Sequence, residues 1–149
     1  MYSPTCQYAI RALVHLARRE GEGPALARDI AAREEIPKSF LSKILHQLVQ
    51  KGLVRSQKGP GGGFALARAA TAITIADITE AVDGGPVATH RCLLGLPECS
   101  DATGCALHES WKKLRQDYDR NIGPLTLADL ARTATDSRLP GADPTPPVG

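Results

Sequence analysis

Three of the four cysteines in this 149-residue chain lie within one short stretch of its second half. Cys92, Cys99 and Cys105 are followed by His108, in the spacing C-x6-C-x5-C-x2-H. Three thiolates and an imidazole can complete a tetrahedral metal site or hold a small iron–sulfur cluster. Cys105 and His108 lie three residues apart at the start of a predicted helix, so both can face one point. The spacing therefore predicts a metal centre.

The chemistry of these four side chains does not choose between iron and zinc. Three cysteines and one histidine are also a common zinc set, although the lack of any C-x2-C pair argues against an ordinary zinc knuckle. Three unrelated buried cysteines are the other alternative, and their clustering in a loop bent by glycine and proline argues against it. In a reducing cytoplasm such clustering favours metal or redox chemistry over structural disulfides.

The stretch before the cysteines predicts a helix-turn-helix. We expect a first helix over residues 3–19 and two more within 26–54, separated by a turn near 35–38. The last of these helices has one apolar face, and its other face carries Ser39, Ser42, Lys43, His46, Gln47 and Gln50. Side chains of these types can bond base edges and phosphates in a major groove. An ordinary helix pair with a solvated polar face would show the same periodicity.

Residues 53–68 favour DNA binding over that alternative, because they predict a wing. Two short strand-like runs flank a glycine-rich turn, which is typical of a β-hairpin. Lys58 lies at the tip, and Gly61 belongs to the GPGGG run that follows. Glycines there allow positive φ and let the backbone approach a groove closely. We therefore predict a mainly α winged helix-turn-helix that contacts DNA through Lys58 and Gly61 as well as the helix.

A long amphipathic helix is predicted after the cysteine loop, over residues 105–122. Its large apolar residues recur at steps of 4, 3, 4 and 4, and they are Leu107, Trp111, Leu114, Tyr118 and Ile122. Burial against the protein's own core and a dimer seam explain this pattern equally well. A DNA-reading module usually needs two half-sites, so we predict a homodimer.

Two capped helices complete the predicted elements. Thr74 and Asp77 are expected to cap a helix over 74–85, and Thr126 and Asp129 a short helix that ends near Arg132. The predicted organisation is a DNA-binding domain at 1–83, a cysteine loop at 84–104, a dimerisation segment at 105–136 and a disordered, proline-rich tail at 137–149.

Composition and charge limit the function classes. Residues 1–70 carry 11 Lys and Arg against 5 Asp and Glu, whereas residues 71–149 carry 7 against 11. A basic half suits nucleic-acid binding. No apolar run approaches the roughly 20 residues that span a bilayer, and the start of the chain does not resemble a signal peptide, so we expect a cytoplasmic protein without membrane partners. Nothing in the pattern of polar residues predicts an enzyme.

Several stretches together resemble the IscR/NsrR-type family of winged-helix iron–sulfur transcription regulators. They are YAIRAL, IPKSFLSKILHQLVQKGLV, the wing KGPGGGF and the three-cysteine loop, and they span most of residues 3–132. The resemblance implies a homodimer with crossing long helices, recognition helices in successive major grooves and wings in the minor groove. It also implies an iron–sulfur cluster, 2Fe-2S or 4Fe-4S, through which iron, redox state or nitric oxide is sensed.

The resemblance also assigns roles by position. It places base and phosphate contacts at Ser39, Ser42 and Lys43, a minor-groove contact at Lys58, and cluster ligands at Cys92, Cys99 and Cys105. The fourth ligand varies among relatives, and we predict His108, with Cys6 on the first helix as the alternative. Cys6 is otherwise a small core residue, and His15 and His46 are expected on helix surfaces. The sequence departs from the family pattern at two places. Six residues separate the first two cysteines, where several relatives have five, which leaves the cluster type open. Ser42 stands where the iron–sulfur biogenesis regulator has a glutamate.

Overall fold

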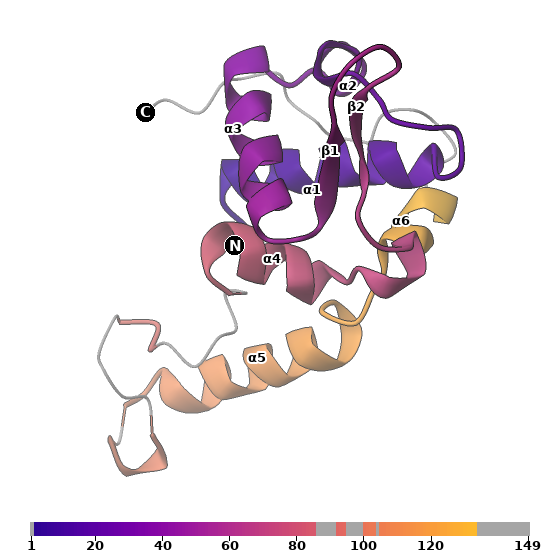
Figure 1. Ribbon diagram of the computed structural model, residues 1–149. Helices are drawn as coiled ribbons and strands as arrows, with labels where there is room; N and C mark the ends of the chain where they lie inside the picture. Colours follow the sequence, from indigo (N-terminus) through magenta and orange to yellow (C-terminus); the bar gives the residue numbers. More distant parts are fainter. Residues whose placement is uncertain (1, 86–91, 95–99, 104, 134–149) are drawn as a thin grey trace.

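The computed structural model describes residues 2–85, 92–94, 100–103 and 105–133 (Figure 1). In this part of the chain, the elements are helices and a single two-stranded hairpin. The elements are α1 (Pro4–Arg18), α2 (Ala27–Glu34), α3 (Lys38–Gln50), β1 (Val54–Gln57), β2 (Gly63–Leu66), the 3-10 helix η1 (Ala70–Ala72), α4 (Ile75–Asp83), the 3-10 helix η2 (Asp101–Thr103), α5 (His108–Asn121) and α6 (Leu127–Thr133). This order confirms the predicted mainly α winged helix-turn-helix with a small β-hairpin.

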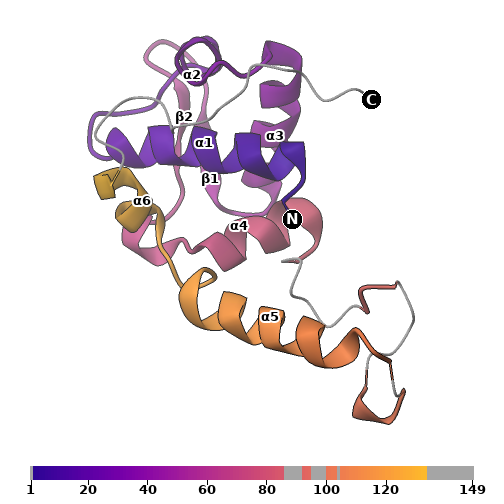
Figure 2. The same ribbon diagram turned by 180° about the vertical axis from the view of Figure 1, so that it is seen from behind.

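Helix α1 is the centre of the core, and α2, α3, α4, α6 and β2 all pack against it (Figures 1 and 2). Ser3 caps its start by accepting a hydrogen bond from the Cys6 amide at 3.0 Å, and Pro4 occupies the first helical position. Small and aliphatic side chains are buried on more than one side of α1, and they include Ala9, Ala12, Leu13, Val14 and Leu16. Small residues let the neighbouring helices approach closely.

The turn between α2 and α3 is anchored to α1. Glu35 has φ 53°, a left-handed conformation that is uncommon for a residue other than glycine. The preceding Glu34 is buried, with Oε1 2.9 Å from Nδ1 of His15 on α1, and its carbonyl accepts a hydrogen bond from Arg11. The expectation that His15 lies on a helix surface is wrong, because α2 covers it. Glu34 supplies the hydrogen bond that burial of a polar ring requires.

The hairpin follows α3 directly and pairs Val54 with Leu66 through to Gln57 with Gly63. A third segment joins it, since the amides and carbonyls of Ala25 and Phe64 exchange two hydrogen bonds of 2.8 Å. Gly63 makes this approach possible. Its φ is +143°, and a Cβ built there would lie 2.4 Å from the Ala25 carbonyl oxygen. The base of the wing is thereby attached to the segment that leads into α2.

The last two helices attach to different parts of the molecule. The chain after α5 runs alongside the start of α4, where the Ile75 amide donates to the Leu125 carbonyl at 2.8 Å. Helix α6 packs on α1 and η1 and buries Leu127 completely. Helix α5 extends along the end of the molecule opposite α2 and the wing turn (Figures 1 and 2). The predicted segment 105–136 contains both α5 and α6, whereas in the structure α6 packs in the N-terminal core.

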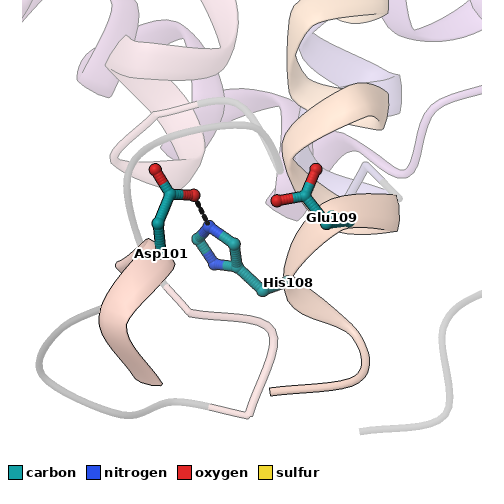
Figure 3. Close-up of side chains that lie close together, drawn as sticks. All are labelled: Asp101, His108 and Glu109. Atoms are coloured by element: carbon teal, nitrogen blue, oxygen red, sulfur yellow. Dashed lines mark hydrogen bonds and ion pairs between the residues drawn. The ribbon is translucent and has the colours of Figure 1, made fainter. Parts of the chain in front are cut away.

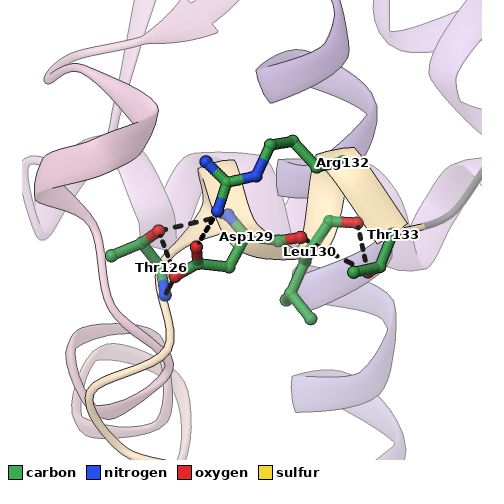
Figure 4. A network of polar contacts seen from close by, with 5 residues as sticks. All are labelled: Thr126, Asp129, Leu130, Arg132 and Thr133. Carbon is green, nitrogen blue, oxygen red and sulfur yellow. Dashed lines mark hydrogen bonds and ion pairs between the residues drawn. The ribbon is translucent and has the colours of Figure 1, made fainter.

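Both predicted capping pairs are confirmed. Thr74 and Asp77 form a capping box at the start of α4. At α6 the Thr126 amide and hydroxyl donate to Oδ2 of Asp129 at 2.9 and 2.7 Å, and the Asp129 amide donates back at 3.2 Å (Figure 4). These bonds from Thr126, followed by the charge of Arg132, hold the pKa of Asp129 below its usual value. The cap is therefore a charged acceptor at neutral pH.

No helix in the described ranges is both long enough and apolar enough to cross a membrane.

The contact at the base of the wing predicts the effect of Gly63→Ala. The added Cβ would meet the Ala25 carbonyl, and the φ of +143° at this position is unfavourable for a residue with a Cβ. We therefore expect the free energy of unfolding to fall by about 2–4 kcal/mol. Gly61→Ala is the matched control, because its φ is +72° but nothing lies within 4 Å of the new Cβ. It should cost about 1 kcal/mol. Urea unfolding measures both, and equal losses would show that the Ala25 contact places no demand on residue 63.

Candidate functional site

The predicted DNA-contacting residues of helix and wing all lie in exposed positions. Ser39, Ser42 and Lys43 occupy the first half of α3, and Lys58 and Gly61 lie in the turn between β1 and β2. The wing turn, α2 and the start of α3 are at the same end of the molecule, and α5 is at the other (Figure 1). The fold therefore brings these side chains to one end, where a duplex could contact helix and wing together.

Further positive charge gathers at this end. Lys38 is the exposed first residue of α3, and Arg28 and Arg33 are exposed on α2. The N-terminal end of a helix favours phosphate, and the N-cap residue of α3 is Pro37, whose side chain makes no capping bond. Lys38 is not among the predicted DNA-contacting residues, although its position directly after the turn between the two helices indicates such a role.

Gln47 does not belong to the exposed face on which the sequence places it. It is half-buried, and its Nε2 donates to the Ala81 carbonyl at 3.0 Å and the Val82 carbonyl at 3.3 Å. These carbonyls belong to the last turn of α4, so Gln47 joins α3 to α4. His46 and Gln50 remain exposed, with their side-chain nitrogens 3.2 Å apart. The polar face available to DNA thus has a gap at Gln47 in the second half of α3.

The cysteine loop is described in part. Cys92 and Cys105 are half-buried, and Cys99 lies outside the described residues. Helix α5 starts at His108, not at Cys105, because residues 105–107 form a turn in which the His108 amide donates to the Cys105 carbonyl at 3.0 Å. The bond spans three residues, as in a single helical turn. Cys105 and His108 are therefore held in one turn at the start of α5.

His108 is buried, with 7% of its surface exposed, and it has an acidic partner that the sequence analysis did not identify. Its Nε2 lies 2.8 Å from Oδ1 of Asp101 on η2 (Figure 3). Lys112 Nζ lies 3.0 Å from the same oxygen. Lys112 first, and then His108, hold the pKa of Asp101 below its usual value. The carboxyl of Glu109 is close by. One side-chain oxygen or nitrogen from each of Asp101, His108 and Glu109 lies within 4.8 Å of the others.

Cys6 is a core residue in this structure. It is completely buried on α1, and burial, followed by the nearby Asp83 carboxylate, raises the pKa of its thiol to about 12. Metal ligation requires the thiolate. Its environment therefore suits the core role better than that of an alternative fourth ligand. The neighbouring Gln7 is exposed and donates to the Tyr2 carbonyl at 3.3 Å.

Comparison with protein families and characterised sequences agrees with this architecture. The model of the Rrf2 family, described as iron-dependent transcriptional regulator, matches residues 2–133. The HTH-type transcriptional regulator IscR of Xenorhabdus nematophila is 35% identical over 126 residues, which cover 85% of this chain and 76% of that protein. A putative HTH-type transcriptional regulator of Aquifex aeolicus is 36% identical over 132 residues, which cover 87% of this chain and 90% of that protein.

Solved structures give the same result for the fold. CymR, the global cysteine regulator of B. subtilis, superposes with a TM-score of 0.76 at 29% identity, covering 91% of this chain and 98% of that chain. IscR of T. potens superposes with a TM-score of 0.72 at 26% identity, covering 90% and 88%. The relatives are named as transcriptional regulators, which is not an enzymatic role. The chain thus belongs to the Rrf2 family and is a DNA-binding, winged-helix transcription regulator.

Proposed function

We propose that this regulator works as a homodimer and senses iron, redox state or nitric oxide through an iron–sulfur cluster. Cys92, Cys99, Cys105 and His108 would hold the cluster, whether 2Fe-2S or 4Fe-4S. The observation that carries the proposal is the placement of Cys105 and His108 in one turn at the start of α5. Thiolates with one imidazole suit iron–sulfur ligation, and the family's description as iron-dependent favours iron.

A bound cluster would supply a redox-active centre that also reacts with nitric oxide. The chain's own contacts connect its ligands to the DNA-contacting helix. At the other end of α5, the hydroxyl of Tyr118 lies 3.3 Å from Oγ1 of Thr79 on α4, and the last turn of α4 accepts the hydrogen bonds of Gln47 on α3. A change at the first turn of α5 can therefore shift α4 and α3 together, which is the kind of two-state coupling a sensor needs.

The surface of α5 supports a second copy of the chain as the dimer partner. The apolar seam predicted from the sequence divides into two groups. Trp111 is buried and Tyr118 half-buried, whereas Leu107, Leu114 and Ile122 expose 43%, 51% and 40% of their surfaces. Exposed aliphatic residues at helical spacing suit packing against the same helix of a partner. Within this proposal, the chain divides into a DNA-binding part, a cluster loop and the dimerisation helix α5.

DNA contact would use the exposed end of the molecule described above. In the proposal Ser39, Ser42 and Lys43 reach bases and phosphates of the major groove, while Lys58 and Gly61 of the wing approach the minor groove. Lysines that meet phosphates release counterions, so their contribution depends on salt concentration. The short hydroxyl side chains of Ser39 and Ser42 can bond base edges.

The cluster proposal predicts coloured protein. Anaerobically purified or reconstituted protein should absorb visible light and contain iron and sulfide, and Cys99→Ser should lose this absorption and keep its helical circular dichroism. Cys6→Ala is the matched control, because Cys6 is completely buried among core residues of α1, and it should keep the absorption. Mössbauer spectra assign a two-iron or four-iron cluster. Colourless protein with stoichiometric zinc and no sulfide would establish the zinc alternative, and metal-free protein with reversible cysteine oxidation a thiol switch.

The DNA proposal predicts that replacing either lysine makes the affinity for DNA less dependent on salt concentration. The probe is a fluorescent duplex that the protein itself selects from random-sequence DNA. Lys43→Ala and Lys58→Ala should each weaken binding, and each should reduce the slope of log affinity against log salt by about 1 if the lysine meets one phosphate. Lys113→Ala on α5 is the matched control, because this lysine is exposed far from the wing. Unchanged slopes for both Lys43 and Lys58 variants would place the DNA surface elsewhere.

The environment of Cys6 predicts slow alkylation. A thiol whose pKa is about 12 carries almost no thiolate at pH 8, and burial also blocks access. In the folded protein stripped of metal, iodoacetamide at pH 8 should leave Cys6 unmodified while Cys105, which is half-buried, reacts. Peptide mass spectrometry reads the modification, and urea should make Cys6 reactive. Rapid modification of Cys6 without urea would mean that α1 opens readily, and that Cys6 remains available as a ligand.

A further inference from the structure

We propose that Asp101 is the positioning residue of His108, and that it directs the Nδ1 atom of that ring to the cluster. The inference rests on the proposed function, because it concerns how the fourth ligand is oriented. Its starting point is the 2.8 Å contact between His108 Nε2 and Asp101 Oδ1. An ionised carboxylate only accepts hydrogen bonds, so Nε2 must carry the proton. In the neutral ring the lone pair that can bind iron then belongs to Nδ1.

The chain geometry points the same way. Nδ1 is the ring nitrogen nearer to the backbone, and the His108 amide is bonded to the carbonyl of Cys105. Because the two residues share one turn of chain, the ring nitrogen nearer to the backbone has the shorter reach to a cluster that Cys105 also binds. Figure 3 shows Nε2 turned toward Asp101, on the other side of the ring from the backbone attachment. Ligation through Nε2 would require the ring to leave Asp101, and the ring is held by burial of all but 7% of its residue surface.

Asp101 is itself held in place. Lys112 Nζ contacts its two oxygens at 3.0 and 3.3 Å, and Lys112 lies one helical turn after His108 on α5. The carboxylate thus bridges two residues on one face of α5. Asp101 belongs to η2, in the segment between Cys99 and Cys105. A carboxylate that accepts the second N–H of a ligating histidine fixes the ring and raises its basicity.

A mononuclear metal site made by Asp101, His108 and Glu109 is less consistent with these contacts. The three groups offer ligand atoms within 4.8 Å of one another, but the ammonium of Lys112 already contacts Asp101. A cation bound there would have to displace Lys112 or lie beside it. The arrangement therefore fits an oriented histidine better than a separate cation site.

The test uses the full-length, anaerobically reconstituted protein with Asp101→Asn as the variant. Loss of the hydrogen-bonding carboxylate should make cluster loss to a chelator about 10-fold faster or more, and the reduction potential should become more positive because the imidazole donates less strongly. Glu109→Gln is the matched control, because it removes the same charge from a neighbouring position, and it should behave as wild type. Asp101→Glu should restore part of the wild-type potential.

Selective labelling identifies the ligating atom directly. Protein made with histidine carrying 15N only at Nδ1 should show, by pulsed EPR of the reduced cluster, the strong coupling of a coordinated nitrogen at the labelled atom. Strong coupling at unlabelled Nε2 overturns the inference, as do equal potentials in Asp101→Asn and Glu109→Gln. Both results leave the cluster proposal standing, whereas wild-type protein that holds no iron and sulfide overturns the proposed function itself.

Discussion

The hydrogen bond between His15 and Glu34 determines where α3, the proposed recognition helix, lies. Both side chains are buried, and a buried polar pair is tolerated only when each group has its partner. Glu34 is the last residue of α2, and the left-handed Glu35 that follows starts the turn into α3. Because Arg11 also binds the Glu34 carbonyl, α1 holds the end of α2 by side chain and backbone together. The direction in which α3 leaves the turn depends on these contacts.

A second set of polar contacts joins the DNA-contacting unit to the rest of the chain. Gln47 connects α3 to the last turn of α4, and Ser3 at the start of α1 donates from its amide to Asp83 at the end of α4 at 3.2 Å. Thr79 and Tyr118 then connect α4 to α5. Each of these bonds has one partner on α4. Helix α4 is therefore one element through which a movement of α5 can reach α3.

The elements were predictable from local signals, and the pairings between distant residues were not. Thr74 with Asp77 and Thr126 with Asp129 lie three residues apart, so their caps can be identified from sequence alone. His15 depends on Glu34, which lies 19 residues away, and periodicity could not show that α2 would cover it. The cysteine spacing located the candidate site, but Asp101 was missed because a carboxylate in a loop has no pattern that marks it as a histidine partner.

The bridge between Ala25 and Phe64 also bears on how DNA is read. It fastens the base of the wing to the segment that enters the helix-turn-helix, which restricts movement of the wing relative to α3. A wing and a helix at restricted spacing adjust little to each duplex. The width of the minor groove and the ease with which the intervening base steps bend must then match the protein. Positions that no side chain touches would therefore contribute to the choice of binding site.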